Sequence, residues 1–228
     1  MEQLHNGFTL ELCKGAFPLS TDSMALSGFV KLPREAKVLD LGAGCGTLGL
    51  LLCASDPGCS VTGIEIDETA HNMALHNIAA NQLDTRLTSI CADLQTVPAF
   101  LAPGSFDCCV SNPPYFSANQ KSANSSARHE LSCTLDALFA AASWAVRYGG
   151  DFFLVHKPER LAELCVCAAK HKLEPKRLQL LRHKPCDPVS LVLMQCRKGG
   201  KPGLTIEEAC LQDADGNPSA YYRRLYHI

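Results

Sequence analysis

The segment VLDLGAGCGTLGL, at residues 38–50, decides the fold of this chain. Its apolar start predicts a buried strand that is covered on both faces. The alternating glycines Gly42, Gly44 and Gly46 predict a tight turn, against whose bare backbone a ligand can lie. The leucines that follow predict a helix, and a helix N-terminus that points into such a turn attracts negative or electron-rich groups.

Two classes of ligand fit this turn. Gly44-x-Gly46-x-x-Gly49 matches the fingerprint of dinucleotide-binding enzymes, which hold a pyrophosphate at this place. The wider frame, Asp40-x-Gly42-x-Gly44-x-Gly46, resembles motif I of the class I S-adenosylmethionine (SAM)-dependent methyltransferases. SAM carries a cationic sulfonium and an amino-acid tail, so an acidic side chain beside the turn is useful, and Asp40 supplies one. A turn without a ligand is disfavoured, because three spaced glycines cost chain entropy.

The next two predicted strands also end at acidic side chains. A strand at residues 60–66 places Glu65 near its end, 23 residues after Gly42. At that offset an acid accepts hydrogen bonds from ribose hydroxyls, and Asp67 is the better helix cap. A strand at residues 87–92 leads to Asp93, which suits either an adenine amino group or a helix cap. Because parallel strands gather their binding sites beyond their carboxyl ends, we expect these residues to converge.

A fourth predicted strand, at residues 106–111, runs into Asn112-Pro113-Pro114-Tyr115. A conjugated amino group must pyramidalise before it attacks a methyl carbon, and two acceptors outside the ring plane favour that change. The side-chain oxygen of Asn112 and the carbonyl of Pro113 can supply them, since proline restrains the backbone. Tyr115 offers an aromatic face to a planar base. We therefore predict catalytic roles for Asn112, Pro113 and Tyr115; a merely rigid loop is the alternative.

The rest of the chain predicts an alternation of helices and strands, which is typical of a parallel sheet. We expect one domain over residues 1–228, with residues 1–36 as an N-terminal cap and residues 37–228 as the SAM-binding and catalytic core. Residues 117–132 predict a long polar loop, usually a functional or mobile feature. The other predicted elements are a helix of about eight residues that ends near residues 32–33, helices at 67–81, 135–146 (closed by Gly149-Gly150), 159–171 and near 221–225, and strands at 151–156, 178–181, 190–196 and 204–211.

Composition restricts the class of protein. The chain has 228 residues, enough for one domain with a sizeable core. It has no apolar run of about 18 residues that would span a membrane, and its first residues lack the features of a secretory signal. Its 13 cysteines contain no Cys-x-x-Cys pair. They predict buried thiols in a reducing cytoplasm and no metal site.

Charge is distributed unevenly along the chain. The net charge is −2, but residues 1–143 hold 7 basic and 14 acidic residues, whereas residues 144–228 hold 14 basic and 9 acidic residues. Such polarity can present a basic face to an anionic partner, although an ordinary solvated surface is equally compatible with it.

Four segments together extend the resemblance to a narrower family. Residues 15–23, 38–46, 111–116 and 128–130 are similar to the bacterial valine-tRNA adenine-N6 methyltransferases, over nearly the whole chain. That family belongs to the class I amino-group methyltransferases and modifies the adenine 3′ to the anticodon, position 37. The resemblance implies a Rossmann-like fold with a mostly parallel seven-stranded sheet flanked by helices, SAM as cofactor and tRNA as partner.

The resemblance also implies roles for individual residues. It assigns to the substrate Tyr115, Phe116 and Arg128. It assigns to SAM a larger set of residues: Thr21, Asp22, Asp40, Gly42, Gly44, Gly46, Glu65, Asp93 and Asn112. Since the chain as a whole is mildly acidic, RNA phosphates must be held by its basic second half. The residues expected to do so are Lys170, Lys172, Lys176, Arg177, Arg182, Lys184, Arg197 and Lys198.

Four other functions stay open on the sequence. A guanine-N2 rRNA methyltransferase has nearly the same Asn-Pro-Pro loop. A glutamine-amide protein methyltransferase generally carries a helical domain before motif I, and only 37 residues precede Val38 here. A nicotinamide-dependent oxidoreductase accounts for the glycines but leaves residues 112–115 without a role. A non-catalytic RNA-binding protein with this fold would not need Asp40, Glu65 and Asn112.

Overall fold

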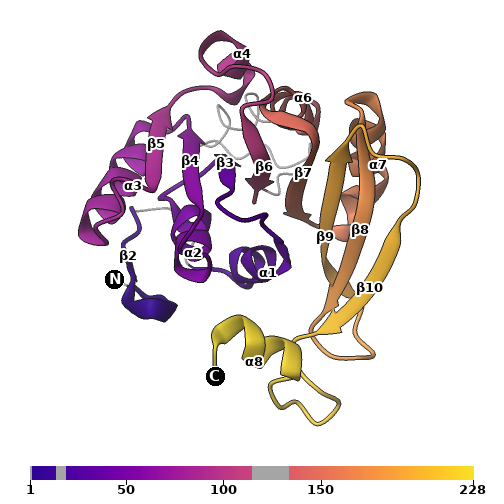
Figure 1. Cartoon of the computed structure of the whole chain (residues 1–228). Helices are drawn as coiled ribbons and strands as arrows, with labels where there is room; N and C mark the ends of the chain where they lie inside the picture. Colours follow the sequence, from indigo (N-terminus) through magenta and orange to yellow (C-terminus); the bar gives the residue numbers. More distant parts are fainter. Residues whose placement is uncertain (1, 14–18, 115–133) are drawn as a thin grey trace, which may run out of the picture.

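The computed structural model describes residues 2–13, 19–114 and 134–228. Its centre is an eight-stranded sheet with the order β10-β8-β9-β7-β6-β3-β4-β5 (Figure 1). The strands are β3 (Lys37–Leu41), β4 (Ser60–Glu65), β5 (Leu87–Cys91), β6 (Phe106–Ser111), β7 (Val146–His156), β8 (Leu173–Arg182), β9 (Val189–Lys198) and β10 (Thr205–Cys210).

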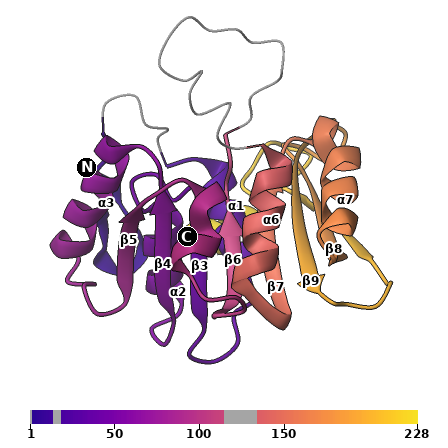
Figure 2. The same ribbon diagram turned by 90° about the horizontal axis from the view of Figure 1, so that it is seen from above.

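Strand direction agrees with the predicted mostly parallel sheet of a Rossmann-like fold. Strands β5, β4, β3, β6 and β7 are parallel and lie side by side (Figure 2). The chain builds outward from β3 first through β4 and β5 and then through β6 and β7, so the strand order reverses at β3. The turns after β3 and β6 therefore diverge at one edge of the sheet, where ligands bind in such folds.

The predicted count of seven strands is wrong by one. Strand β9 runs antiparallel to both β7 and β8, and β10 adds an eighth strand parallel to β8 at the edge. The predicted strand at residues 204–211 therefore exists, as an addition to the seven that the resemblance implies.

Helices cover both faces of the sheet (Figure 1). One apolar cluster joins helices α1, α2, α3 and α8 to the sheet, and a second joins α4, α6 and α7 to the opposite face. Polar side chains cap four of these helices: Ser20, Asp67, Thr134 and Ser219 each accept a backbone N–H of the first turn. The helices are α1 (Thr21–Phe29), α2 (Thr47–Ser55), α3 (Glu68–Ala80), α4 (Val97–Phe100), α6 (Leu135–Ala145), α7 (Leu161–Lys170) and α8 (Ala220–Tyr226).

The predicted end of α6 at Gly149-Gly150 is wrong. Helix α6 ends at Ala145, and β7 begins at once with Val146, which pairs with Phe106. A bulge then shifts the register, and Gly149 lies in the left-handed region with φ +77° inside the strand. A Cβ at Gly150 would stand 2.5 Å from the carbonyl oxygen of Asp107. Gly150 therefore allows close strand packing and Gly149 allows a left-handed backbone, and the pair does not close a helix.

The N-terminal segment forms a short hairpin of β1 (Glu2–Gln3) and β2 (Thr9–Leu10). It packs beside α3, whereas α8 near the other terminus packs against α1. Within the described ranges, no helix combines the length and apolarity needed to cross a membrane.

Candidate active site

The glycine turn after β3 is open on one side. Gly42, Gly44 and Gly46 have φ values of +77°, +55° and +85°, which favour glycine. The amides of Gly42 and Ala43 both donate to the carbonyl of Ile64, at 3.0 Å, and so join the turn to β4. A Cβ built at Gly42 or Gly44 would meet no atom within 4 Å. The turn therefore offers a cradle beside bare backbone at the start of α2.

Glu65 holds the turn from the end of β4. The side chain is 8 % exposed; its Oε2 accepts the Gly44 amide at 2.8 Å, and its Oε1 accepts the Asp67 amide at 2.9 Å. Asp67 is the cap of α3, as the sequence predicts, because its Oδ1 accepts the Ala70 amide at 2.8 Å. Each oxygen of Glu65 keeps a further acceptor site, which suits a sugar hydroxyl.

Asp40 lies beneath the turn and not on its open side. The residue is 1 % exposed, and neither carboxylate oxygen accepts a hydrogen bond from the described residues. Burial, followed by the negative charge of Glu65, raises the pKa of Asp40 to about 7. The side chain lines a small internal cavity together with Gly46, Gly49 and Ser89. The carboxylate therefore lies in the interior beside the turn, and its contact with SAM stays a prediction.

Asn112 is held by a residue far away in the chain. The Nδ2 of Asn112 donates to the Oγ of Ser23 on α1, at 3.0 Å, and Ser23 is only 7 % exposed. This contact turns the Nδ2 of the amide toward Ser23 and its Oδ1 away from Ser23. Pro113, which follows, is buried. Just before, the Ser111 hydroxyl donates to the Leu41 carbonyl at 2.7 Å and so ties the end of β6 to the end of β3.

Ser23 and Ser111 are residues of the site that the sequence did not single out. Ser20, and not Ser23, caps α1, because the Oγ of Ser20 accepts the Ser23 amide at 3.3 Å. Ser111 read as the last residue of an apolar strand. The sequence feature that could have pointed to Ser111 is a small hydroxyl residue at a strand end, directly before Asn-Pro-Pro.

The remaining predicted cofactor residues lie around the same edge. Thr21 and Asp22 occupy the first turn of α1, and the Oγ1 of Thr21 lies 3.4 Å from the hydroxyl of Tyr226 on α8. Asp93 caps the short helix η2 (Leu94–Thr96), since its Oδ1 accepts the Gln95 amide at 2.9 Å. The predicted substrate residues Tyr115, Phe116 and Arg128, and the predicted loop 117–132, lie outside the described residues.

Ile66 is an apolar residue of this edge that the sequence did not single out. It directly follows Glu65 and is 42 % exposed, although the pattern placed it inside the second strand. An exposed isoleucine beside an acid at a strand end suits a planar ligand that has one apolar face and one polar edge.

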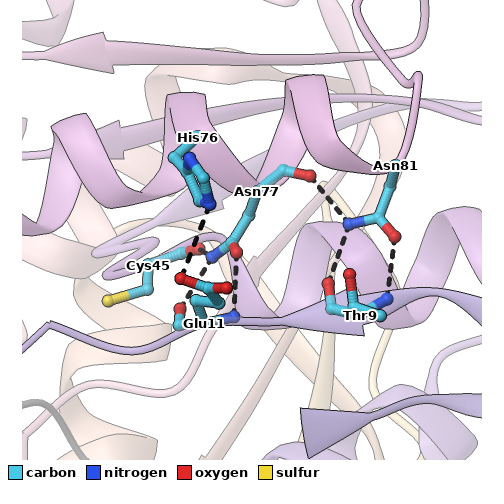
Figure 3. A network of polar contacts seen from close by, with 6 residues as sticks. All are labelled: Thr9, Glu11, Cys45, His76, Asn77 and Asn81. Carbon is cyan, nitrogen blue, oxygen red and sulfur yellow. Dashed lines mark hydrogen bonds and ion pairs between the residues drawn. The ribbon is translucent and has the colours of Figure 1, made fainter. Parts of the chain in front are cut away.

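Asn77 on α3 and Asn81, which directly follows that helix, hold the N-terminal segment against the turn (Figure 3). Asn81 accepts the Thr9 amide and donates to the Thr9 carbonyl, each at 2.8 Å. Asn77 likewise accepts the Glu11 amide at 2.9 Å and donates to the Glu11 carbonyl at 2.8 Å. It also donates to the Cys45 carbonyl in the turn at 2.9 Å. The side chains replace a neighbouring strand, so residues 9–11 are fixed beside the glycine turn.

Half of the basic residues expected to hold phosphates have acidic partners within the protein. Arg177 also lies 4.1 Å from the centroid of the Phe29 ring and is mostly buried. Arg223 and Arg224 on α8 differ, because both are exposed and neither pairs with a carboxylate of the described residues. The four ion pairs are Lys170–Asp136, Arg177–Glu207, Arg182–Glu208 and Arg197–Asp151.

A known protein family matches the part of the chain that carries most of this site. The family model for the methyltransferase small domain matches residues 21–167, from the first turn of α1 to α7. The chain belongs to the methyltransferase small domain family. The predicted class of enzyme is thereby confirmed, and the oxidoreductase alternative is set aside.

Relatives of this methyltransferase agree in fold and in class. A tRNA1(Val) (adenine(37)-N6)-methyltransferase from Bacteroides fragilis is 30 % identical over 190 residues, 82 % of this chain and 80 % of the relative. The structure of a predicted O-methyltransferase from Agrobacterium tumefaciens has a TM-score of 0.77 at 20 % identity and covers 91 % of this chain and 96 % of its own. A geranyl diphosphate C-methyltransferase from Streptomyces coelicolor, solved with S-adenosyl-L-homocysteine, has a TM-score of 0.60 at 13 % identity. The match covers 77 % of this chain and 76 % of that enzyme. These structures share the Rossmann-like fold predicted from the sequence.

Proposed function

We propose that this methyltransferase uses SAM to methylate the exocyclic N6 of adenine 37 in a valine tRNA, in the cytoplasm. The observation that carries the proposal is the orientation of Asn112 by Ser23 at the mouth of an open glycine turn. The named tRNA methyltransferase from Bacteroides fragilis, which matches about four fifths of the chain, supports the choice of substrate.

The described residues fit SAM at this edge of the sheet. The space beside Gly42 and Gly44 is open, so a ligand can lie against the backbone there. Residues 37–228 would form most of the site, and residues 1–36 would cover its mouth. The residues that would hold SAM are Thr21 and Asp22 at the amino-acid tail, Gly42, Gly44 and Gly46 along the turn, Glu65 at the ribose, and Ile66 and Asp93 at the adenine. Asp40 would support the turn from below.

The chemistry then depends on how the target amine is presented. SAM supplies an electrophilic methyl group on its sulfonium. Asn112 Oδ1 and the Pro113 carbonyl accept the two hydrogens of the amine, which draws its lone pair out of conjugation with the ring. Tyr115 and Phe116 would stack on the base, and Arg128 would contact the RNA. Orientation and electrostatics provide the acceleration, and the extra proton leaves to solvent after transfer.

Labelled SAM and total tRNA test the proposal directly. We expect incorporation of label into tRNA, and N6-methyladenosine as the modified nucleoside after digestion and mass analysis. Asn112→Ala should abolish transfer while SAM binding, measured by calorimetry, survives. Asn72→Ala, which removes an exposed amide from α3, is the matched control and should behave as wild type.

Other outcomes would change the substrate. Methylated guanosine from rRNA, or methylglutamine from protein, with no label in tRNA would reject tRNA adenine as the target. Full turnover by Asn112→Ala would reject the proposed role of the amide.

A further inference from the structure

Two thiols meet at the glycine turn. The Sγ of Cys13, in the N-terminal segment, lies 3.6 Å from the Sγ of Cys45, which stands between Gly44 and Gly46. Cys45 is buried and Cys13 is partly exposed. Neither residue has a role in the proposed methyl transfer, so the proximity of the two thiols needs its own explanation.

We propose that Cys13 and Cys45 form a site of reversible oxidative modification, which takes a hydroperoxide and closes as a disulfide. A disulfide bond is about 2.05 Å long, so the two sulfurs must approach each other by about 1.5 Å from the observed 3.6 Å. A movement of this size is within the reach of two side-chain rotations and a small shift of the backbone.

The order of the two steps follows from exposure. The Cys13 thiol is the accessible one, so it attacks the hydroperoxide, becomes a sulfenic acid and releases an alcohol or water. The Cys45 sulfur then attacks the Cys13 sulfur; the S–S bond forms, the S–O bond breaks, and the Cys45 proton leaves with the hydroxyl as water. Burial raises the pKa of Cys45 to about 11, which keeps this thiol from reacting first.

The consequence of the disulfide depends on what surrounds the two thiols. Asn77 already bonds both Glu11 and the Cys45 carbonyl, so the two segments are held in register before any bond forms (Figure 3). A disulfide would pull the middle of the turn toward the N-terminal segment and fix Gly44 and Gly46 in a new position. This effect on SAM binding rests on the proposed function; the formation of the bond does not.

The experiment treats the purified full-length protein with hydrogen peroxide, digests it without reduction and maps cross-linked peptides by mass spectrometry. SAM affinity is measured by calorimetry on reduced, oxidised and re-reduced protein. We expect a Cys13–Cys45 peptide that has lost two hydrogens, and a fall in SAM affinity of about tenfold or more that dithiothreitol reverses. Cys13→Ser should bind SAM normally and keep its affinity in peroxide. Cys210→Ser, which removes another partly exposed thiol, should respond as wild type.

Three results would overturn parts of this scheme. Absence of the Cys13–Cys45 peptide under conditions that oxidise the exposed Cys186 would reject the site. A cross-linked protein with unchanged SAM affinity would reject the effect on the turn. Reduced protein that does not bind SAM would reject the proposed function, while the peptide map would still decide whether the thiols couple.

Discussion

At the scale of single residues, Ser23 carries the orientation of the proposed catalytic amide. Its hydroxyl accepts from Asn112 Nδ2 at 3.0 Å, so Ser23→Ala removes one contact that orients the amide. A lost hydrogen bond of this kind is worth roughly 1 kcal/mol. We expect kcat for tRNA methylation to fall about fivefold to tenfold, with little change in KM for SAM, in steady-state kinetics.

Ser27 provides the control for this prediction. It lies on the same helix, and its hydroxyl donates only to the Met24 carbonyl at 2.9 Å. Ser27→Ala should keep its kcat. An equal loss of kcat in both variants would show that α1 had been disturbed as a whole and that Ser23 has no particular role.

Asp40 gives the stability of the free protein a defined dependence on pH. Its pKa is raised from 3.8 to about 7 in the folded state, so between these values the folded protein binds a proton that the unfolded chain releases. Stability must then fall as pH rises through this window. The Asp40→Asn variant cannot ionise at this position. Its free energy of unfolding should therefore rise relative to that of the wild type by roughly 4 kcal/mol between pH 4 and pH 8.

Urea unfolding of both proteins at several pH values measures the difference. The two should be similar near pH 4, where Asp40 is neutral, and should diverge up to about pH 7. A difference that stays constant over this range would show that Asp40 ionises as an ordinary carboxyl.

At the scale of elements, the start of β7 makes a prediction that separates two interpretations of Gly149-Gly150. If these glycines closed a helix, alanine at position 150 would be tolerated. In the strand, its Cβ would meet the Asp107 carbonyl oxygen at 2.5 Å and the Val146 side chain at 2.7 Å. We expect Gly150→Ala to lower the free energy of unfolding by about 1–3 kcal/mol in urea titrations.

Gly58→Ala is the matched control, because a Cβ there meets its nearest neighbour at an ordinary 3.4 Å. It should change stability by less than about 0.5 kcal/mol. Normal stability of Gly150→Ala would contradict the strand assignment.

Several elements could be predicted from the sequence because their signals are local. The strand at 106–111 has the predicted bounds, and Asp67 caps α3 as expected. The prediction of β8 covered only residues 178–181, whereas the strand starts at Leu173 and includes Pro175. Strand β9 pairs with this start, and that non-local pairing outweighs the poor strand propensity of its polar residues, whereas β10 pairs only with residues 177–182.

At the scale of the whole molecule, charge decides where an RNA can bind. The excess of basic residues in the second half of the chain predicts a cationic face, but Arg177, Arg182 and Arg197 pair with carboxylates of their own sheet. Arg223 and Arg224 on α8 are among the basic side chains that remain available to bind RNA phosphates. Helix α8 contacts Thr21 through Tyr226. The balance of charges can be counted along the chain, whereas the internal ion pairs exist only in the three-dimensional arrangement.

The double variant Arg223→Ala/Arg224→Ala tests this placement. If both side chains contact phosphates, tRNA binding should weaken, and the slope of log affinity against log salt should decrease in magnitude by about 2. Filter binding or anisotropy at several salt concentrations measures the slope. Lys201→Ala, which removes an exposed charge from the turn before β10, should leave it nearly unchanged. An unaltered slope in the double variant would place the RNA elsewhere.

The same distinction applies to the candidate site as a whole. Residues at the ends of β3, β4 and β6 could be predicted, because a motif fixes its position along the chain and a parallel sheet brings the strand ends together. The contacts Ser23–Asn112 and Asn77–Glu11 join residues 89 and 66 positions apart. No periodicity or spacing encodes such pairs, which exist only once the helices have packed.

The contacts of Asn77 and Asn81 with the N-terminal segment restrict substitution more at the two asparagines than at the residues that they hold. Because Asn77 and Asn81 hold Thr9 and Glu11 through backbone groups alone, these contacts allow nearly any side chain at positions 9 and 11 except proline, which has no N–H. Replacement of either asparagine would instead leave an amide and a carbonyl of that stretch without partners. Among natural variants of this enzyme, we therefore expect the side chains at positions 9 and 11 to vary and the two asparagines to be retained.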